Sequence, residues 1–169
     1  MRISEIANPR QVVLVTSEAD AEILGKKSLK KNIITLAWHM PLSFEPPMYA
    51  VAVGKTRFSC SLIKKSKCFV VNFMPADRQK EVLYCGSKSG MYVDKFKESG
   101  LTDEECEKVH CIRIREALGW LECEVVEEVE AGDHIVFIGR VVNISENPKA
   151  KKGSKRLFHL DGDKFTTTG

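Results

Sequence analysis

Residues 54–61 combine the side-chain types that bind a phosphate group. Lys55 and Arg57 supply positive charge within a polar turn that follows a glycine. Hydroxyl groups are added by Thr56, Ser59 and Ser61. Cations and hydroxyls donate the hydrogen bonds that an anion prefers, and a helix beginning here would add free backbone N–H groups. The segment predicts an anion site, although a routine helix cap beside two solvated cations explains the same residues.

Residues 39–47 are a second candidate wall of a binding site. His39 and Ser43 follow an apolar stretch, and Pro46 and Pro47 cannot donate the hydrogen bonds of a strand. We therefore expect a rigid, exposed turn here. Rigid loops at the end of a sheet commonly line ligand sites, but a simple strand connection stiffened by proline fits the same pattern.

Two turns that contain glycine complete the candidates. Residues 86–90 place two serines and Lys88 between glycines, so the backbone could approach an anion closely. Their spacing is not that of a Walker loop, and a flexible loop between helices is the alternative. In residues 132–134, Asp133 precedes His134 and could orient its imidazole toward a ligand, or the histidine could make a surface hydrogen bond.

Metal ions and nucleic acids have weaker signatures. The six cysteines are scattered without a C-x-x-C pair, so no metal site is predicted. The basic loop at residues 149–156 has no interleaved aromatic residues of the kind that stack on single strands. A net charge of +3 is too small to indicate nucleic acid, and we expect no such partner.

The elements that position these residues are mainly strands. A length of 169 residues with 43% apolar side chains predicts a single domain over residues 1–169. Residues 18–31 fit a polar hairpin that turns at Gly25. β-branched or alternating apolar patterns predict strands at residues 11–17, 33–38, 48–53, 68–73, 116–128, 134–143 and 158–160.

Few helices are expected. We predict them at residues 59–65, with Thr56 or Ser59 as the cap, at 75–84, and at 92–98, closed by Gly100. Residues 102–105 resemble a helix start or a polar turn. Because strands follow one another directly and no G-x-G-x-x-G motif is present, a β-barrel with a few helices is favoured over a doubly wound fold.

The first six residues carry an acid and lack the apolar core of a signal peptide. No apolar run approaches the roughly 20 residues that span a bilayer. We therefore expect a cytoplasmic protein with no membrane contact, whose cysteines are reduced thiols.

The order of the motifs along the chain points to a family. It begins with the apolar stretch 33–38 and the SFEPP segment at 43–47, and continues through 48–63 and 69–72 to the GDH motif at 132–134. This ordered set resembles the flavin reductase family with the FMN-binding split barrel. Within that family it is most similar to the prokaryotic ferric reductases, and residues 89–96 resemble the flavoredoxin-like branch.

The resemblance implies a mainly β fold, a Greek-key split β-barrel, that works as a homodimer with FMN near the dimer interface. It implies that Thr35, Ala37, Trp38 and His39 pass along the isoalloxazine ring, that Ser43 reaches it from the proline turn, and that His134 lies where nicotinamide stacks. The residues it implies for the phosphate are Lys55, Thr56, Arg57 and Ser59. Those it implies for closing the pocket are Cys85, Ser87, Lys88, Ser89, Gly90 and Lys95.

The implied activity is hydride transfer from NAD(P)H to flavin, followed by electron transfer to a ferric chelate or free flavin. The cofactor carries this chemistry, so no side chain is expected to act as a nucleophile. Two alternatives stay open. One is a flavoredoxin, which carries electrons on bound FMN for a protein partner, and the other is a barrel without catalytic activity that binds phosphate or RNA through cationic loops.

Overall fold

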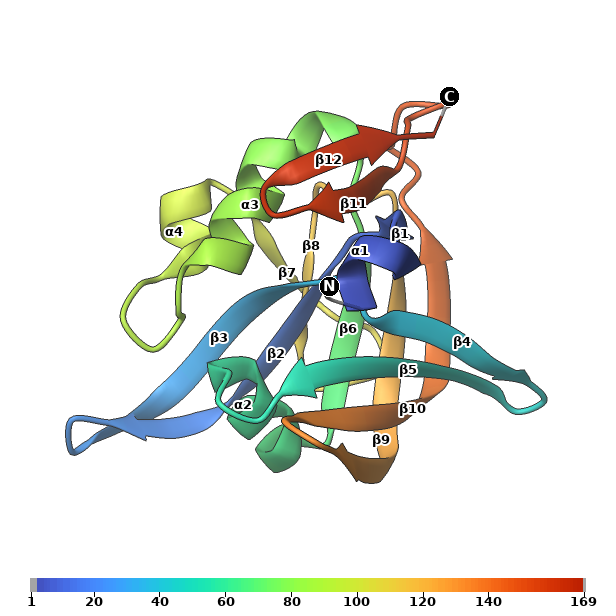
Figure 1. Cartoon of the computed structure of the whole chain (residues 1–169). Helices are drawn as coiled ribbons and strands as arrows, with labels where there is room; N and C mark the ends of the chain where they lie inside the picture. The colour runs from blue at the N-terminus through green and yellow to red at the C-terminus, as the bar shows by residue number, and fades with distance from the viewer. Residues whose placement is uncertain (1–2, 169) are drawn as a thin grey trace.

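Antiparallel strands dominate the computed structural model, which describes residues 3–168 (Figure 1). Seven of them form one sheet in the order β3-β2-β6-β9-β10-β5-β4. Their bounds are β2 Val13–Ile23, β3 Lys26–Leu36, β4 His39–Phe44, β5 Pro47–Gly54, β6 Cys68–Phe73, β9 Gly119–Ala131 and β10 His134–Glu146. The predicted mainly β class is confirmed.

The sheet must curl because its two edge strands are consecutive in the chain. β3 and β4 lie at opposite edges, yet only Ala37 and Trp38 separate them. The Ala52 N–H of β5 also donates to the Trp38 carbonyl at 2.9 Å. The edges therefore approach each other at this corner, and the sheet forms a barrel that is incomplete between them (Figure 1).

The central strands have Greek-key order. β6, β9 and β10 lie side by side in the sheet in the order in which the chain reaches them, and the earlier strand β5 lies on the other side of β10. The chain passes from β5 to β6 through helix α2, Phe58–Ser66, which packs against β2. This crossover places the start of α2 at the same end of the barrel as the corner between β3 and β4.

Strand β6, at the centre of the sheet, is buried on both faces. In β6, Phe69 and Val71 belong to the core inside the barrel, whereas Val70 belongs to a second core on the outer face. Because alternate residues of a strand point to opposite faces, two cores require consecutive apolar residues, which β6 has from Cys68 to Val71. Gly139 of β10 allows Phe69 to fill the interior, since a Cβ there would lie 2.8 Å from the Phe69 ring.

The outer core is covered by short elements. Helices α3, Gln79–Ser87, and α4, Lys95–Ser99, lie over β3 and β2 (Figure 1). The 3-10 turn η1, Ala76–Arg78, precedes α3. The remaining elements are α1 Ile3–Ala7, a hairpin of β7 Asp103–Glu105 with β8 Ile112–Ile114, and a small sheet of β1 Arg10–Gln11, β11 Leu157–Asp161 and β12 Lys164–Thr167.

The structure corrects the prediction of a turn at 39–47. Residues 39–44 form strand β4, and the turn is confined to Glu45 and Pro46. Pro46 does lie in the turn, whereas Pro47 begins β5. Pro41 fits in β4 because this is an edge strand, where a missing N–H is tolerated, and its pairing is irregular between Pro41 and Ser43. The predicted hairpin at Gly25 is confirmed, with φ of 76° at this glycine.

The helix boundaries also differ from the predictions. Helix α2 begins after Arg57 without a side-chain cap, so the expected cap at Thr56 or Ser59 was wrong. Helix α4 begins at Lys95 because Asp94 caps it, and Gly100 ends it as predicted. The segment 102–105 expected as a helix start or turn contains strand β7, which pairs with β8.

Candidate functional site

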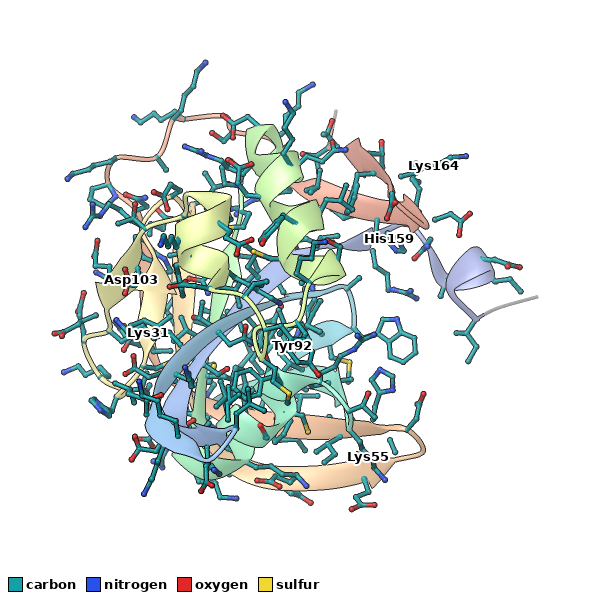
Figure 2. The ribbon with its side chains drawn as sticks, turned by 90° about the vertical axis from the view of Figure 1, so that its left-hand side faces the viewer. Lys31, Lys55, Tyr92, Asp103, His159 and Lys164 are labelled. Carbon is teal, nitrogen blue, oxygen red and sulfur yellow. The ribbon has the colours of Figure 1, made fainter. Side chains whose placement is uncertain are left out.

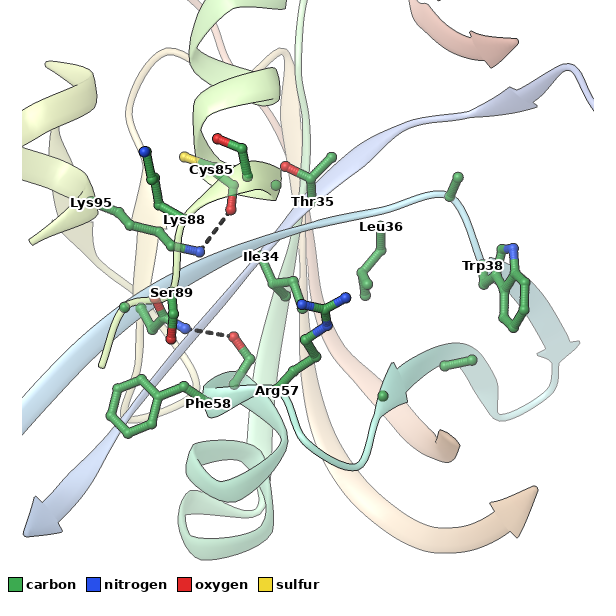
Figure 3. Close-up of a pocket in the computed structure, with 18 of the residues that line it drawn as sticks. Ile34, Thr35, Leu36, Trp38, Arg57, Phe58, Cys85, Lys88, Ser89 and Lys95 are labelled. Carbon is green, nitrogen blue, oxygen red and sulfur yellow. Dashed lines mark hydrogen bonds between the residues drawn. The ribbon is translucent and has the colours of Figure 1, made fainter. Parts of the chain in front are cut away.

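A cavity of about 460 Å³ lies at the end of the barrel where the sheet edges meet. It is enclosed by β3, the turn between β5 and α2, the end of α3 and the loop that follows α3 (Figure 3). Its size is typical of a site for a cofactor. Thirteen of the predicted site residues line it, namely Thr35, Ala37, Trp38, Thr56, Arg57, Ser59, Cys85, Ser87, Lys88, Ser89, Gly90, Lys95 and His134.

The start of α2 forms one wall and is equipped to bind an anion. Arg57 takes an extended conformation before the helix, and no side chain caps the first-turn N–H groups. Such groups carry the positive end of the helix dipole. Ser59 is fully buried on this turn, and its Oγ accepts a hydrogen bond from Asn32 Nδ2 at 2.8 Å. The hydroxyl proton of Ser59 therefore stays available to a ligand.

The contact between Asn32 and Gly90 shows how closely the loop after α3 approaches β3. The Oδ1 atom of Asn32 is buried and has no hydrogen-bond partner among the described residues. A Cβ on Gly90 would lie only 1.9 Å from this oxygen, so any larger residue would have to displace the loop or the amide. An unpartnered buried acceptor beside a cavity is expected where a ligand donates the missing hydrogen bond.

Lys95 places a charge inside the protein without a carboxylate beside it. Its side chain is buried, and Nζ donates to the carbonyl of Ile33 at 2.6 Å and to that of Cys85 at 2.7 Å, the second of which is shown in Figure 3. No carboxylate among the described residues lies within ion-pair distance of it. Burial, with a smaller contribution from the nearby Arg57, lowers the pKa of Lys95 to about 8.

Cys85 and Thr35 build the wall between α3 and β3 instead of offering reactive groups. Burial raises the pKa of the Cys85 thiol to about 11, so it is neutral near pH 7. Thr35 Oγ1 donates to the Val82 carbonyl at 2.6 Å and thereby fixes α3 against β3. A Cβ on Gly86 would meet the Thr35 side chain at 3.2 Å, so the two elements pack closely.

Aromatic rings form the other end of the cavity. The Trp38 and His134 rings lie 4.8 Å apart between centroids, tilted by 31°. His134 Nδ1 lies 2.7 Å from Asp133 Oδ1, which orients the imidazole as expected from the Asp-His pair. The Trp38 side chain is 41% exposed, so an incoming planar ligand has access to it.

All formal charges that line the cavity are positive. They are carried by Arg10, Arg57, Lys88 and Lys95, and no aspartate or glutamate is among the lining residues. The protein as a whole has a net charge of only +3. The concentration of cations is therefore a property of this site, and it favours an anionic ligand.

Three residues of the predicted set lie outside the cavity lining. Lys55 points to the β9–β10 hairpin and pairs with Glu130 at 2.9 Å (Figure 2). His39 is held by the Gln11 carbonyl at 2.9 Å and the Tyr49 hydroxyl at 2.7 Å, and burial lowers its pKa. Ser43 lies on β4 near the end of its hairpin. None of the three therefore lines this cavity.

Several lining residues were not predicted from sequence. Asn32 directly precedes the predicted strand 33–38, a position with no specific signal. Arg10 and His159 are brought to the cavity by pairing of the two ends of the chain, which no local pattern reveals. The remaining lining residues are apolar or glycine. Ile34 and Ala52 lie in predicted strands, whereas Leu36, Gly54, Phe58 and Gly86 lie within segments that the sequence had already indicated for the site.

Neither a metal centre nor a membrane-spanning helix is found within residues 3–168. In this part of the chain, no group of three or more histidine, cysteine or acidic side chains is arranged to hold a metal ion. Its helices are all too short or too polar to cross a membrane.

Comparison with known proteins identifies the family. The model of the flavin reductase like domain matches residues 6–168. An uncharacterized protein of Archaeoglobus fulgidus is 38% identical over 144 residues, which cover 82% of this chain and 81% of that protein.

Solved structures share the fold. Flavoredoxin from Methanosarcina acetivorans superposes with a TM-score of 0.82 at 25% identity, over all of this chain and 90% of that one. An FMN-binding protein from Thermus thermophilus, solved with bound p-hydroxybenzaldehyde, gives 0.82 at 23% identity over 96% and 88% of the two chains. The incomplete barrel is thus the FMN-binding split barrel, and the chain belongs to the flavin reductase family.

Proposed function

We propose that this protein binds FMN in the cavity and oxidises NAD(P)H, passing electrons to a ferric chelate or to free flavin. The observation that carries the proposal is a cavity of cofactor size whose charged side chains are all cationic, at the uncapped start of a helix. Bound FMN would supply the chemistry by accepting a hydride and releasing electrons to a second substrate. The chain's own residues would bind the cofactor, orient the reacting rings and exclude water.

The donors fit the phosphate of FMN at one end of the cavity. Arg57 and Ser59 line the cavity at the uncapped start of α2, and Lys88 and Lys95 line it from the loop after α3 and from α4. Lys95 has two carbonyl partners, so a third N–H is available to a phosphate oxygen. The unpartnered Asn32 Oδ1 accepts only, which suits a donor such as a ribityl hydroxyl next to the phosphate.

The other end suits flat rings. The backbone from Thr35, at the end of β3, through Trp38 would run along the isoalloxazine edge. It would act through its peptide groups, because the Thr35 hydroxyl already donates to Val82. His134 and Trp38 would contact the nicotinamide, with Asp133 holding the imidazole in place. These residues act by positioning two rings face to face, a task that needs no acid, base or nucleophile.

A flavoredoxin is the second candidate, supported by the likeness to the Methanosarcina acetivorans protein. It would hold FMN through the same residues but receive electrons from a protein partner. We place either activity in the cytoplasm, because all six cysteines are free thiols. Cysteines stay reduced in a reducing compartment such as the cytoplasm.

The absorbance spectrum of the purified protein tests the proposal. We expect flavin absorbance in the protein as isolated or after FMN is added, and rapid bleaching by NADPH or NADH under anaerobic conditions. Subsequent addition of Fe(III)-EDTA or excess flavin should restore the colour. Bleaching that requires a protein partner would identify the flavoredoxin, and failure to bind FMN at all would favour a phosphate- or RNA-binding barrel instead.

Two neighbouring cations allow a matched test of the phosphate site. Arg57→Gln removes a guanidinium that lines the cavity, and we expect FMN to bind about 10- to 100-fold more weakly, the loss of one charge-assisted hydrogen bond. Lys55→Gln removes a cation that pairs with Glu130 outside the cavity, and FMN affinity should change less than about threefold. Equilibrium dialysis measures both. Equal effects of the two substitutions would contradict this position of the phosphate.

Lys95 should make FMN binding depend on pH. In the free protein the pKa of Lys95 is about 8, and a bound phosphate would raise it. The affinity for FMN therefore has its full value at pH values well below 8, where Lys95 is protonated. It declines as pH rises through 8, by up to about tenfold per pH unit. Titrations between about pH 6.5 and 9.5 should show this slope in the native protein and a flat profile in Lys95→Met. A slope that persists in the variant would assign the proton to another group.

We further propose a homodimer in which a second copy covers β4. This edge strand of the large sheet leaves Met40, Leu42 and Phe44 exposed, Phe44 by 96%, and it continues from Trp38 at the mouth of the cavity. Unpaired apolar edge strands are normally covered. Sedimentation equilibrium should give twice the chain mass of 19.0 kDa, and Phe44→Glu should shift the equilibrium toward monomer. A native protein that stays monomeric at micromolar concentration would refute this arrangement.

A further inference from the structure

Arg10 places a second, separate cation on the cavity. It lies on β1, and its partner across the antiparallel ladder is His159 of β11. Directly paired residues on neighbouring strands point to the same side, and both of these side chains line the cavity. The Arg10 guanidinium carbon lies 5.8 Å from the centroid of the Trp38 ring. The small sheet of β1, β11 and β12 thus carries a positive charge to the aromatic end of the site.

This guanidinium has no anionic partner among the described residues. Its Nε atom is buried and makes no hydrogen bond within that part of the chain. Other arginines of the protein, such as Arg113 and Arg140, contact glutamates at 2.7 Å. A guanidinium cannot lose its proton, so a partly buried one keeps a charge and planar donors that a ligand can use.

His159 holds this corner together but is not itself free to bind a ligand. Its Nε2 atom lies 2.9 Å from the Gly162 carbonyl, to which it donates, and Nδ1 lies 3.5 Å from Asn8 Nδ2. The ring packs edge-on against Phe165, 5.8 Å between centroids. With both ring nitrogens engaged, the imidazole acts as a wall beside Arg10, and Arg10 supplies the charge.

The position of Arg10 separates it from the proposed phosphate site. Figure 3 shows Lys95, Lys88 and Ser89 gathered at one end of the cavity and Trp38, the ring beside Arg10, at the other. FMN has a single phosphate group, which the cations near α2 suffice to bind. The charge beside Trp38 is therefore left over for an anionic group on a second ligand.

We propose that Arg10 binds the anionic group of the redox substrate that enters over Trp38. This inference rests on the proposed function. The candidate ligands share a planar or tetrahedral oxyanion that can accept hydrogen bonds from two N–H groups of the guanidinium, with an attached ring or chelate over Trp38. In the proposed reaction this oxyanion belongs either to the phosphate groups of the nicotinamide nucleotide or to the carboxylates of a ferric chelate.

The test compares Arg10→Gln with Arg10→Lys and with Arg140→Gln in FMN-loaded protein. Arg140 is a matched control, because it pairs with Glu124 on the β9–β10 ladder and does not line the cavity. KM is measured for NADPH and NADH with the uncharged acceptor menadione, and for Fe(III)-EDTA at saturating donor. We expect Arg10→Gln to raise one of these KM values at least about tenfold without loss of FMN, Arg10→Lys to recover part of it, and the control to match the native protein.

The pattern of the increase identifies the source of the anion. An effect on NADPH alone points to its additional phosphate, an effect on both nucleotides to the pyrophosphate, and an effect on Fe(III)-EDTA alone to the carboxylates of the acceptor. Unchanged KM values for all three substrates would overturn the proposal. A loss of bound FMN in Arg10→Gln would equally overturn it, since Arg10 would then belong to the cofactor site.

A binding measurement keeps this test independent of turnover. NADP⁺ and Fe(III)-EDTA are titrated separately against each variant, following the fluorescence of tryptophan, because Trp38 lies beside Arg10. Weaker binding of either probe to Arg10→Gln, with native affinity in Arg140→Gln, supports the site. Identical dissociation constants in all variants refute it. Failure of the proposed function is seen separately, as native protein that holds no flavin or whose flavin NAD(P)H does not bleach.

Discussion

The rest of the site must stabilise the buried ammonium group of Lys95. It lies on α4 and binds one carbonyl from β3 and one from α3, so three separate elements meet at a single charge. Carbonyl dipoles offset only part of the cost of burying a cation, which amounts to several kcal/mol. The lowered pKa of Lys95 expresses the remaining cost. An anion in the cavity would remove it, so the local fold and the expected ligand depend on the same interaction.

The curled sheet is what allows such a cavity to exist. The corner at Ala37 and Trp38 brings the two sheet edges together, and the crossover from β5 through α2 begins at the same end of the barrel. The cavity therefore has strand backbone on one side and a helix start on the other. Neither wall depends on a long loop, although the loop between α3 and α4 closes the third side through the close packing of Gly90 on Asn32. Rigid walls suit a site that must hold two flat rings in contact.

Those parts of the site that are continuous in the chain could be predicted from the sequence. Arg57 and Ser59 lie in one polar turn, and their residue types together with the expected helix start were enough to indicate an anion. Lys55 of the same turn pairs with Glu130 and does not line the cavity. A sequence specifies residue types but not which side of a turn each side chain takes. Arg10 and His159 could not be found locally, since only pairing of the two ends of the chain joins them. Strand β4 was missed because Pro41, together with Pro46 and Pro47 just after the strand, is typical of loops, and a sequence does not reveal that a strand lies at an edge.

The distribution of charge explains how a nearly neutral protein can hold a strongly cationic cavity. On the outer surface several cations pair with glutamates, as Lys67 does with Glu128 and Arg140 with Glu124. The cavity has no acidic residue, so its cations keep their full field for a ligand. The same environment keeps the Cys85 thiol neutral, because burial outweighs the attraction of Lys95 for a thiolate. The site therefore has strong binding groups and no activated nucleophile, which is the combination expected of a protein that leaves the chemistry to its cofactor.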